Sequence, residues 1–491
     1  MKRRSLGILG FLLGTFVVLV APLSQAQNVD ERIHLLTQEL EKLKAEQEQV
    51  KSEHLQLKKE ASAAAAALPA FAYRPGRGMT ITAADKSWGF NVSSQLHLRL
   101  YNYLDGNDAD GAVTGKLFGR RMRLFTNYCW VNCFYDLELS LDMDQSDIPV
   151  ELRRAQLDFN FNQWNPYLPV LRVGLDADAR KGHAVSSSSS ARWERNPIND
   201  DSSVSGDGSH QGIGLVWSGV PLGVSTIDLE SHLTTGRLDA ADSATTFSDR
   251  MGWIGYIGGK PFGRTKDKWL NGLELRFEVQ MESADDRAGV AADLGGAGAG
   301  TYRRQRLRTT ERIGRFTLAD TGNNAIGKGL HYFLQPALIY KIGPYAFNGV
   351  WTTSRWEGQS DAFRGVTADG IVLANELYLW SPKGAFTGSA TTPSAVLFGW
   401  AFGRYNQDCG TGADCSPGAG AFNKIRVLQR ELNLWYTVSD GLRLGLQWNW
   451  WDSSNTPVGV QPAINCTSRP TTDPGKSCDW HTVNATVAFN W

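Results

Sequence analysis

Apolar and polar residues alternate with a period of two along most of the second half of the sequence and much of the first. The last eleven residues show this plainly, since one side of an extended strand would carry Val483, Ala485, Val487, Phe489 and Trp491 while the other carries hydroxyl and amide side chains. A period of two disfavours a helix and predicts a strand with one apolar and one polar face. Repeated at bilayer-spanning lengths, an apolar-out, polar-in pattern is typical of a closed transmembrane β-barrel.

The same alternation recurs from residue 88 onward. Between Cys133 and Met143, leucines face one way while Asp136, Glu138 and Asp142 face the other, so one face of this strand is wet. We therefore predict an all-β transmembrane barrel of about 16 antiparallel strands. The predicted strands are 89–104, 121–128, 133–143, 151–161, 170–176, 211–219, 223–233, 250–259, 270–282, 330–341, 345–357, 371–380, 395–405, 424–438, 442–452 and 480–491.

The lengths of the connections agree with an outer-membrane barrel, which has short periplasmic turns and long outer loops. The long connections are 177–210, 234–249, 283–329, 406–423 and 453–479, and most of the intervening ones are short. There are two exceptions, a short outer loop at 145–150 and a long inner turn at 381–394.

The N-terminus has the marks of a secretory signal peptide at residues 1–26. Three basic residues, Lys2, Arg3 and Arg4, precede an apolar run over 6–20, and Ser24 to Ala26 fits a small-x-small cleavage site. No later apolar run reaches the roughly 20 residues that a transmembrane helix needs. We expect the mature chain to be exported.

Residues 28–60 have a different period. Apolar or tolerated polar residues recur at alternating spacings of three and four, at Ile33, Leu36, Leu40, Leu43, Gln47, Val50, His54 and Leu57. This heptad seam predicts a short α-helical coiled coil, which needs partner chains to cover it. Residues 61–87 are expected to be a linker, ahead of the barrel at 88–491.

Charge and motifs exclude several classes of function. Without the leader's three basic residues, the chain of 491 residues has 47 basic and 50 acidic side chains, a net charge of −3, which gives no argument for a nucleic-acid partner. The sequence has no nucleophile elbow and no glycine loop that cradles phosphate. We expect no enzyme activity and no cofactor.

The six cysteines form three close pairs in the sequence: Cys129 with Cys133, Cys409 with Cys415, and Cys466 with Cys478. In an oxidising compartment this spacing indicates disulfides that close turns or loops. A metal site is the competing interpretation, but the spacings match no common zinc pattern and the histidines are scattered. We expect no metal.

Basic residues could line a channel. The connection 177–210 would be the third outer loop and the constriction, and it carries Arg180, Lys181, Arg192 and Arg195. Inward positions on neighbouring strands hold Arg121, Arg123, Arg154 and Arg172. Basic side chains at a constriction would favour anions. Alternatively, nearby Asp and Glu neutralise these charges and merely keep the lumen wet.

Several short motifs resemble the phosphate-selective porin O and P family. They are G-R-R-M-R-L at 119–124, E-L-R-R-A-Q-L-D-F at 151–159, L-R-V-G-L at 171–175, R-W-E-R-N-P-I at 192–198 and the aromatic C-terminus. The order of parts is also similar: leader, coiled coil and a barrel of sixteen strands. The resemblance implies a trimeric anion channel, with arginines and lysines along the lumen that bind phosphate or polyphosphate.

Together these patterns indicate an outer-membrane porin of a Gram-negative-type cell, with its coiled coil in the periplasm. We expect a homotrimer that passes small hydrophilic solutes with a modest preference for anions, phosphate among them. Its other partners would be outer-membrane lipid and lipopolysaccharide, whose phosphates could meet the basic residues between 303 and 315. The alternative is a structural or adhesive surface protein that uses the barrel only as an anchor.

Overall fold

The computed structural model describes two compact units, Met1–Leu68 and Pro69–Trp491. Within them, the described residues are 29–103, 116–143, 150–176, 198, 209–238, 251–284, 306–308, 317–320, 329–356, 366–381, 394–408, 424–454 and 477–491.

The first unit contains one helix, α1 (Val29–Ala67), which runs beyond the predicted 28–60. The apolar seam side chains, from Ile33 to Leu57, are more than half exposed in the single chain. A helix with such a stripe gains stability only when another surface covers it. The helix is therefore observed, and the coiled coil remains a prediction. Among the described residues, no helix combines the length and apolarity required to cross a membrane.

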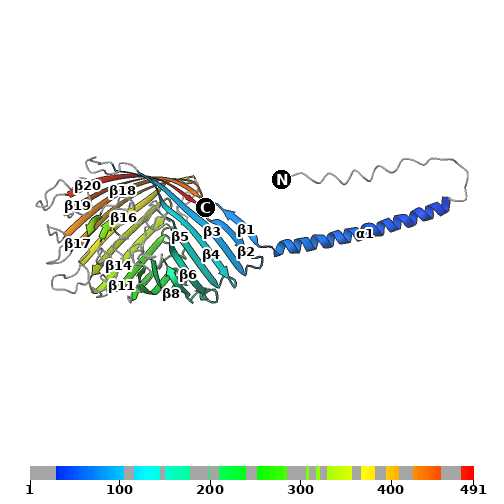
Figure 1. Cartoon of the computed structure of the whole chain (residues 1–491), viewed down its shortest axis with the longest axis horizontal. Helices are drawn as coiled ribbons and strands as arrows, with labels where there is room; N and C mark the ends of the chain where they lie inside the picture. Colours follow the sequence, from blue (N-terminus) through cyan, green and yellow to red (C-terminus); the bar gives the residue numbers. More distant parts are fainter. Residues whose placement is uncertain are drawn as a thin grey trace. The chain divides into compact units, whose positions relative to one another are not determined.

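The second unit is a closed antiparallel barrel of sixteen strands, as predicted (Figure 1). Each strand pairs with its neighbours in chain order, and the ends of the predicted strands differ from the observed ones by a few residues. The strands are β3 (Trp88–Tyr103), β4 (Lys116–Trp130), β5 (Tyr135–Asp142), β6 (Glu151–Asn160), β7 (Val170–Asp176), β8 (Ser209–Leu222), β9 (Ser225–Leu238), β10 (Met251–Lys260), β11 (Leu273–Ala284), β14 (Gly329–Ile342), β15 (Tyr345–Trp356), β16 (Val366–Trp380), β17 (Ala395–Asp408), β18 (Lys424–Ser439), β19 (Leu442–Ser454) and β20 (Ser477–Asn490).

The last strand closes the barrel against the first. The ladder between β20 and β3 runs from the pair Thr482 and Tyr103 to the pair Asn490 and Gln95. One residue further, the Trp491 N–H donates to the Ser94 carbonyl at 2.9 Å, and the Ser94 N–H donates to the Trp491 carbonyl at 2.7 Å. The ladder thus extends to the final residue of the chain.

A β-hairpin occupies part of the range that the sequence indicated as a linker. It consists of β1 (Ala70–Arg74) and β2 (Gly78–Thr82), and β2 pairs with β3 over Gly89 to Val92. That part of β3 extends past the end of β20, so the hairpin covers an edge that would otherwise be unpaired. A second small sheet, β12 (Arg306–Arg308) with β13 (Thr317–Asp320), lies within the long connection after β11.

Burial along the strands identifies the two faces of the wall. On β20, Thr482 and Asn484 are 0% exposed, whereas Val487 and Phe489 are 42% and 44% exposed. Polar side chains therefore point into the barrel and apolar ones point outward, the reverse of a soluble protein. This arrangement suits a hydrocarbon solvent outside and a polar interior.

Three consecutive strands are short: β5, β6 and β7 have 8, 10 and 7 residues, against 14 to 16 in the flanking β3, β4, β8 and β9. β10, with 10 residues, is short by itself. We call β5, β6 and β7 the low wall. β5 ends at Asp142 and β6 begins at Glu151, so the connection between them is short, as expected. β16 ends at Trp380 and β17 begins at Ala395, so that connection is long, as expected.

We predict that deletion of Trp491 reduces the amount of folded barrel in the membrane, because it removes the last two hydrogen bonds between β20 and β3. The measurement is the heat-modifiable, fast-migrating band on a gel of purified outer membranes. Trp491→Phe keeps the backbone ladder and an aromatic ring, and it should accumulate normally. Normal levels of the truncated chain would contradict the prediction.

Candidate functional site

Three ion pairs lie on β4, β5, β6 and β7 of the inner wall. The Arg123 Nε donates to Asp142 Oδ2 at 2.9 Å, and Asp142 lies directly opposite it in the ladder between β4 and β5. Both side chains are largely buried. An arginine with its carboxylate partner contributes little net charge to the lumen beside it.

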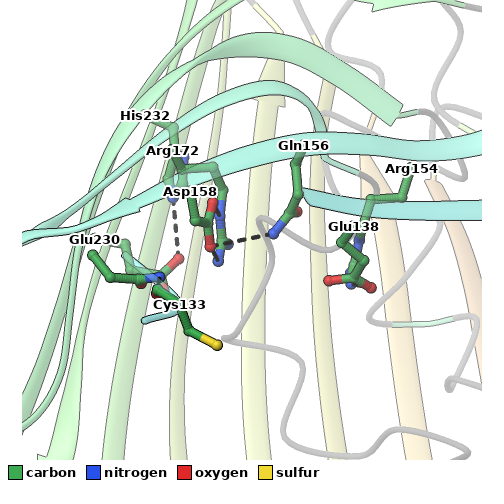
Figure 2. A network of polar contacts seen from close by, with 9 residues as sticks. Cys133, Glu138, Arg154, Gln156, Asp158, Arg172, Glu230 and His232 are labelled. Carbon is green, nitrogen blue, oxygen red and sulfur yellow. Dashed lines mark hydrogen bonds and ion pairs between the residues drawn. The ribbon is translucent and has the colours of Figure 1, made fainter. Parts of the chain in front are cut away.

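Two further arginines make similar contacts on the next strands (Figure 2). Arg172 holds Asp158 with two hydrogen bonds, Nε to Oδ1 at 2.9 Å and Nη2 to Oδ2 at 2.9 Å. Gln156 donates to the same carboxylate at 3.4 Å. Arg154 forms an ion pair with Glu138. Bidentate pairing fixes the orientation of the guanidinium as well as neutralising it.

The structure therefore brings Arg123, Arg154 and Arg172 together on one arc of the wall and gives each a carboxylate. Arg121 lies opposite His97 in the ladder between β3 and β4, and its side chain is outside the described residues. Arg180, Lys181, Arg192 and Arg195 also lie outside them. Neutralisation, which the sequence left open as an alternative, holds for the three arginines whose side chains are described.

A second charged group on β9 and β11 was not singled out from the sequence. His232 lies 3.1 Å from the carboxylate of Glu230, and both are buried on the inner face. On β11, the Arg276 Nε donates to Glu274 at 2.6 Å. Facing His232 is Gly214, where a Cβ would lie 2.0 Å from the imidazole. Because glycine has no side chain, this inward position shows no polar residue in the sequence. The alternation of polar and apolar residues is therefore hard to see along β8.

Amide and hydroxyl groups dominate the inner face of β18, β19 and β20. Gln429 donates to Glu431 at 3.3 Å and to Asn449 at 3.4 Å, and Asn433 donates to Glu431 at 2.5 Å. Thr482, Asn484 and Thr486 continue this surface on β20. This face is rich in hydrogen-bond donors and acceptors with little charge, and its side chains are at most a few per cent exposed.

The inner face of β14, β15, β16 and β17 is different, because apolar side chains there lie among polar ones such as Gln335, Thr352 and Glu376. It contains a cluster of small and aliphatic side chains: Ala337, Ile339, Val350, Ala374 and Ala401. The polar-in, apolar-out alternation that the sequence predicted is present on these strands but weaker. Alanine and glycine at inward positions interrupt the polar pattern on these strands, and the apolar residues opposite them keep a period of two.

Of the three cysteine pairs expected from the sequence, the structure describes one. Cys129 and Cys133 are joined by a disulfide across the turn between β4 and β5. Asn160 and Gln163 donate side-chain hydrogen bonds to the Cys133 carbonyl at 2.9 and 2.7 Å. Cys409, Cys415 and Cys466 lie outside the described residues, as does the side chain of Cys478.

We predict that Arg172→Ala lowers the free energy of unfolding by about 1–3 kcal/mol, because it leaves the half-buried Asp158 carboxylate without its charged donor. Guanidinium titration of the barrel in lipid vesicles, followed by tryptophan fluorescence, measures this change. Adding Asp158→Ala should recover part of the loss in a double-mutant cycle. The control Arg404→Ala, at an exposed position of β17, should change stability by no more than about 0.5 kcal/mol. Purely additive effects of the Arg172 and Asp158 changes would contradict the assigned pair.

Solved structures with a similar fold are outer-membrane barrels. OmpT of Vibrio cholerae, described as an outer membrane protein in trimer form, aligns with a TM-score of 0.50 and 11% identity over 82% of this chain and 100% of its own. The anion-selective porin of Comamonas acidovorans aligns with a TM-score of 0.49 and 10% identity, over 82% of this chain and 100% of its own. The outer membrane channel DcaP of Acinetobacter baumannii aligns with a TM-score of 0.48 and 11% identity, over 82% of this chain and 98% of its own. No family model and no curated protein matches the sequence. The chain thus shares a barrel fold with the outer membrane protein OmpT of Vibrio cholerae.

Proposed function

We propose that this protein is a porin of the outer membrane of a Gram-negative-type cell, which forms a water-filled channel for small hydrophilic solutes. The observation that carries the proposal is the inverted burial along the closed barrel, with polar side chains inside and apolar side chains outside. An outward face of leucine, valine and phenylalanine requires a hydrocarbon surrounding. An inner wall of ion pairs and amides supports a hydrated interior.

The mature chain would begin after the signal peptide at 1–26, and the coiled coil at 28–60 would stand in the periplasm. The periplasmic side is the one that carries the chain termini of the barrel and the short turns, such as that between Ser439 and Leu442. Outer-membrane barrels place their short turns there.

The proposed channel has a modest preference for anions, phosphate among them, which depends on the third outer loop. Arg123, Arg154 and Arg172 are each paired, so the strands between β4 and β7 add little positive field to the bore. Arg180, Lys181, Arg192 and Arg195, in the connection 177–210, are the remaining candidates. Basic side chains at a constriction lower the electrostatic barrier for anions.

We predict that replacing Arg180, Lys181, Arg192 and Arg195 together by glutamine lowers the anion-to-cation permeability ratio roughly twofold or more, because it removes the positive field of the loop. The reversal potential of single channels in a planar bilayer under a salt gradient gives the ratio. The paired change Arg154→Gln with Glu138→Gln removes one charge of each sign and should leave the ratio unchanged. An unaltered ratio in the fourfold variant would remove the anion preference from this loop.

We also propose a homotrimer whose interface includes the low wall at β5, β6 and β7. A strand of 8 residues tilted by about 45° rises about 19 Å, less than the roughly 25 Å apolar band of an outer-membrane barrel. A wall of this height leaves lipid in contact with its polar rim, and a neighbouring subunit would cover that rim instead. The exposed seam of α1 supports association of several copies.

We predict that a photo-cross-linking residue at Leu152 on β6 traps dimers and trimers, because this outward leucine lies on the low wall. Illumination of intact outer membranes and a denaturing gel provide the measurement. The matched control is Leu373 on β16, an outward leucine on the other side of the barrel, which should give no such products. Cross-links from Leu373 alone would place the interface elsewhere, and none from either site would count against the trimer.

One observation favours the alternative function, a structural or adhesive protein with the barrel as an anchor. The inward side chains of Thr352, Gln429 and Asn449, on β15, β18 and β19, are at most 1% exposed, so parts of the inner wall are covered. β13, from the connection after β11, lies beside β18. A bore plugged along its whole length would pass no current. Conductance of the purified protein in a planar bilayer therefore separates the two functions.

A further inference from the structure

The outward side chains of the last four strands change character at one level of the wall. Counting from the end of the barrel that carries Trp491, each of β17, β18, β19 and β20 presents four outward apolar residues in succession. On β18, for example, the four are exposed and are Val438, Tyr436, Leu434 and Leu432. The fifth outward residue of each strand is, in chain order, Arg404, Arg430, Trp450 and His481. The four strands thus share one boundary of their apolar surface.

This boundary lies in the outer half of the membrane in the orientation proposed above. Arg430 is eight residues along β18 from Val438, which at about 3.4 Å per residue and a tilt of about 45° is a rise of about 19 Å. The apolar band of an outer-membrane barrel is roughly 25 Å tall, so Arg430 lies well beyond its midplane. From this level the long arginine side chain reaches the lipid headgroups.

The contacts that Arg404 and Arg430 make with described residues are to neutral groups. The Arg430 guanidinium lies over the Trp450 ring, with Cζ 3.9 Å from the ring centroid. The Arg404 Nε donates to the Asn406 Oδ1 at 3.2 Å. Both arginines are exposed. Each guanidinium therefore keeps N–H groups that can donate to an anion.

The two arginines are close enough to hold one anion together. Phe402 lies directly opposite Arg430 in the ladder between β17 and β18, and Arg404 is two residues further along β17. Diagonal neighbours of this kind are about 7–8 Å apart at their bases, a gap that two arginine side chains can span. The planar guanidinium matches the oxygen atoms of a phosphate.

Stacked rings position one member of this pair. His481 lies directly opposite Trp450, and its ring stacks on those of Trp450 and Trp448 with centroids 5.4 and 5.7 Å apart. The stack restricts the Trp450 ring, and the ring in turn orients the Arg430 guanidinium above it. Indole side chains are typical of the boundary between acyl chains and headgroups.

Neighbouring carboxylates favour a lipid over a dissolved anion as the source of the phosphate. Asp452 is one outward position beyond Trp450 on β19, and Asp369 is one outward position beyond the residue opposite Arg404 on β16. Both lie on the side of the outer rim. A dissolved anion would pass these negative charges to reach the arginines, whereas the phosphate of a lipid already lies where the acyl chains end.

We propose that Arg404, Arg430 and Trp450 form a site on the outside of the wall for the phosphate of an outer-leaflet lipid headgroup. The acyl chains of that lipid lie along Phe402 and Leu432, the exposed apolar residues next to the arginines toward the membrane centre. The site is separate from the bore. The inference rests on the outer-membrane location in the proposed function.

Native mass spectrometry of the full chain in detergent, with diphosphorylated lipid A added as the probe, tests the site. Arg404→Gln combined with Arg430→Gln should weaken lipid binding roughly tenfold, because it removes two charged donors to phosphate. The matched control is Arg74→Gln combined with Arg77→Gln. It removes the same charge from two exposed arginines of the β1–β2 hairpin, whose tip lies beside the turn at Asp440, at the other end of the barrel. The control should bind the lipid as the parent protein does.

Two further probes identify the group that is recognised. The same lipid without its phosphates should bind the parent no better than it binds the Arg404 and Arg430 double variant. Equal binding of the two lipids by the parent would overturn the phosphate assignment. Inorganic phosphate at the same concentration should not displace the lipid, and displacement would overturn the lipid as the source.

Equal binding of lipid A by the parent and the double variant, with both barrels folded by heat modifiability, would overturn the site. So would an equal loss in the control variant, because binding would then depend on net charge and not on position.

Planar-bilayer conductance separates failure of this inference from failure of the channel. A parent protein that binds the lipid phosphate but carries no current would retain the site and refute the porin function. A parent protein that conducts but does not bind the lipid would refute the site alone.

Discussion

The constraint on which the rest of this structure depends is that no backbone N–H or C=O can remain unpaired in hydrocarbon. A sheet satisfies it only by closing, and here closure joins residues almost four hundred positions apart along β3 and β20. The mutual hydrogen bonds of Ser94 and Trp491 carry the ladder to the final residue. Where β3 extends further, β2 continues the pairing, so the edge is covered outside the closed barrel as well.

Closure also determines how charge is distributed inside the bore. Inward side chains of neighbouring strands lie about 5 Å apart at their bases, and a carboxylate directly opposite an arginine forms a pair at little entropic cost. Asp142 opposite Arg123 and Asp158 opposite Arg172 follow this rule. On β4 to β7 the wall is therefore polar, and the charges of Arg123, Arg154 and Arg172 are balanced by carboxylates. In the proposed channel, selectivity for ions of one sign would have to come from groups that the ladder does not pair.

The sequence predicted all sixteen strands because lipid outside and water inside impose a period of two that survives in single-sequence data. It did not predict the ion pairs, since Arg123 and Asp142 are 19 positions apart and register depends on turn geometry. The alternation was weakest where glycine replaces an inward side chain, as at Gly214 beneath His232. The β1–β2 hairpin was missed because strands of five residues are too short to show a period.

The inward positions of β14 to β17 depart most from the barrel pattern, because alanine, glycine and aliphatic residues alternate there with the polar ones. These strands lie across the barrel from the ion pairs of β4 to β7. Apolar wall exposed to water would be unfavourable, whereas apolar wall covered by another apolar side chain is stabilised by burial. At Gly370 and Gly403 that cover is Ile198, whose side chain occupies the space that a Cβ at either glycine would need. The two sides of the barrel therefore differ in what they contact: charged partners on β4 to β7, and buried apolar contacts on β16 and β17.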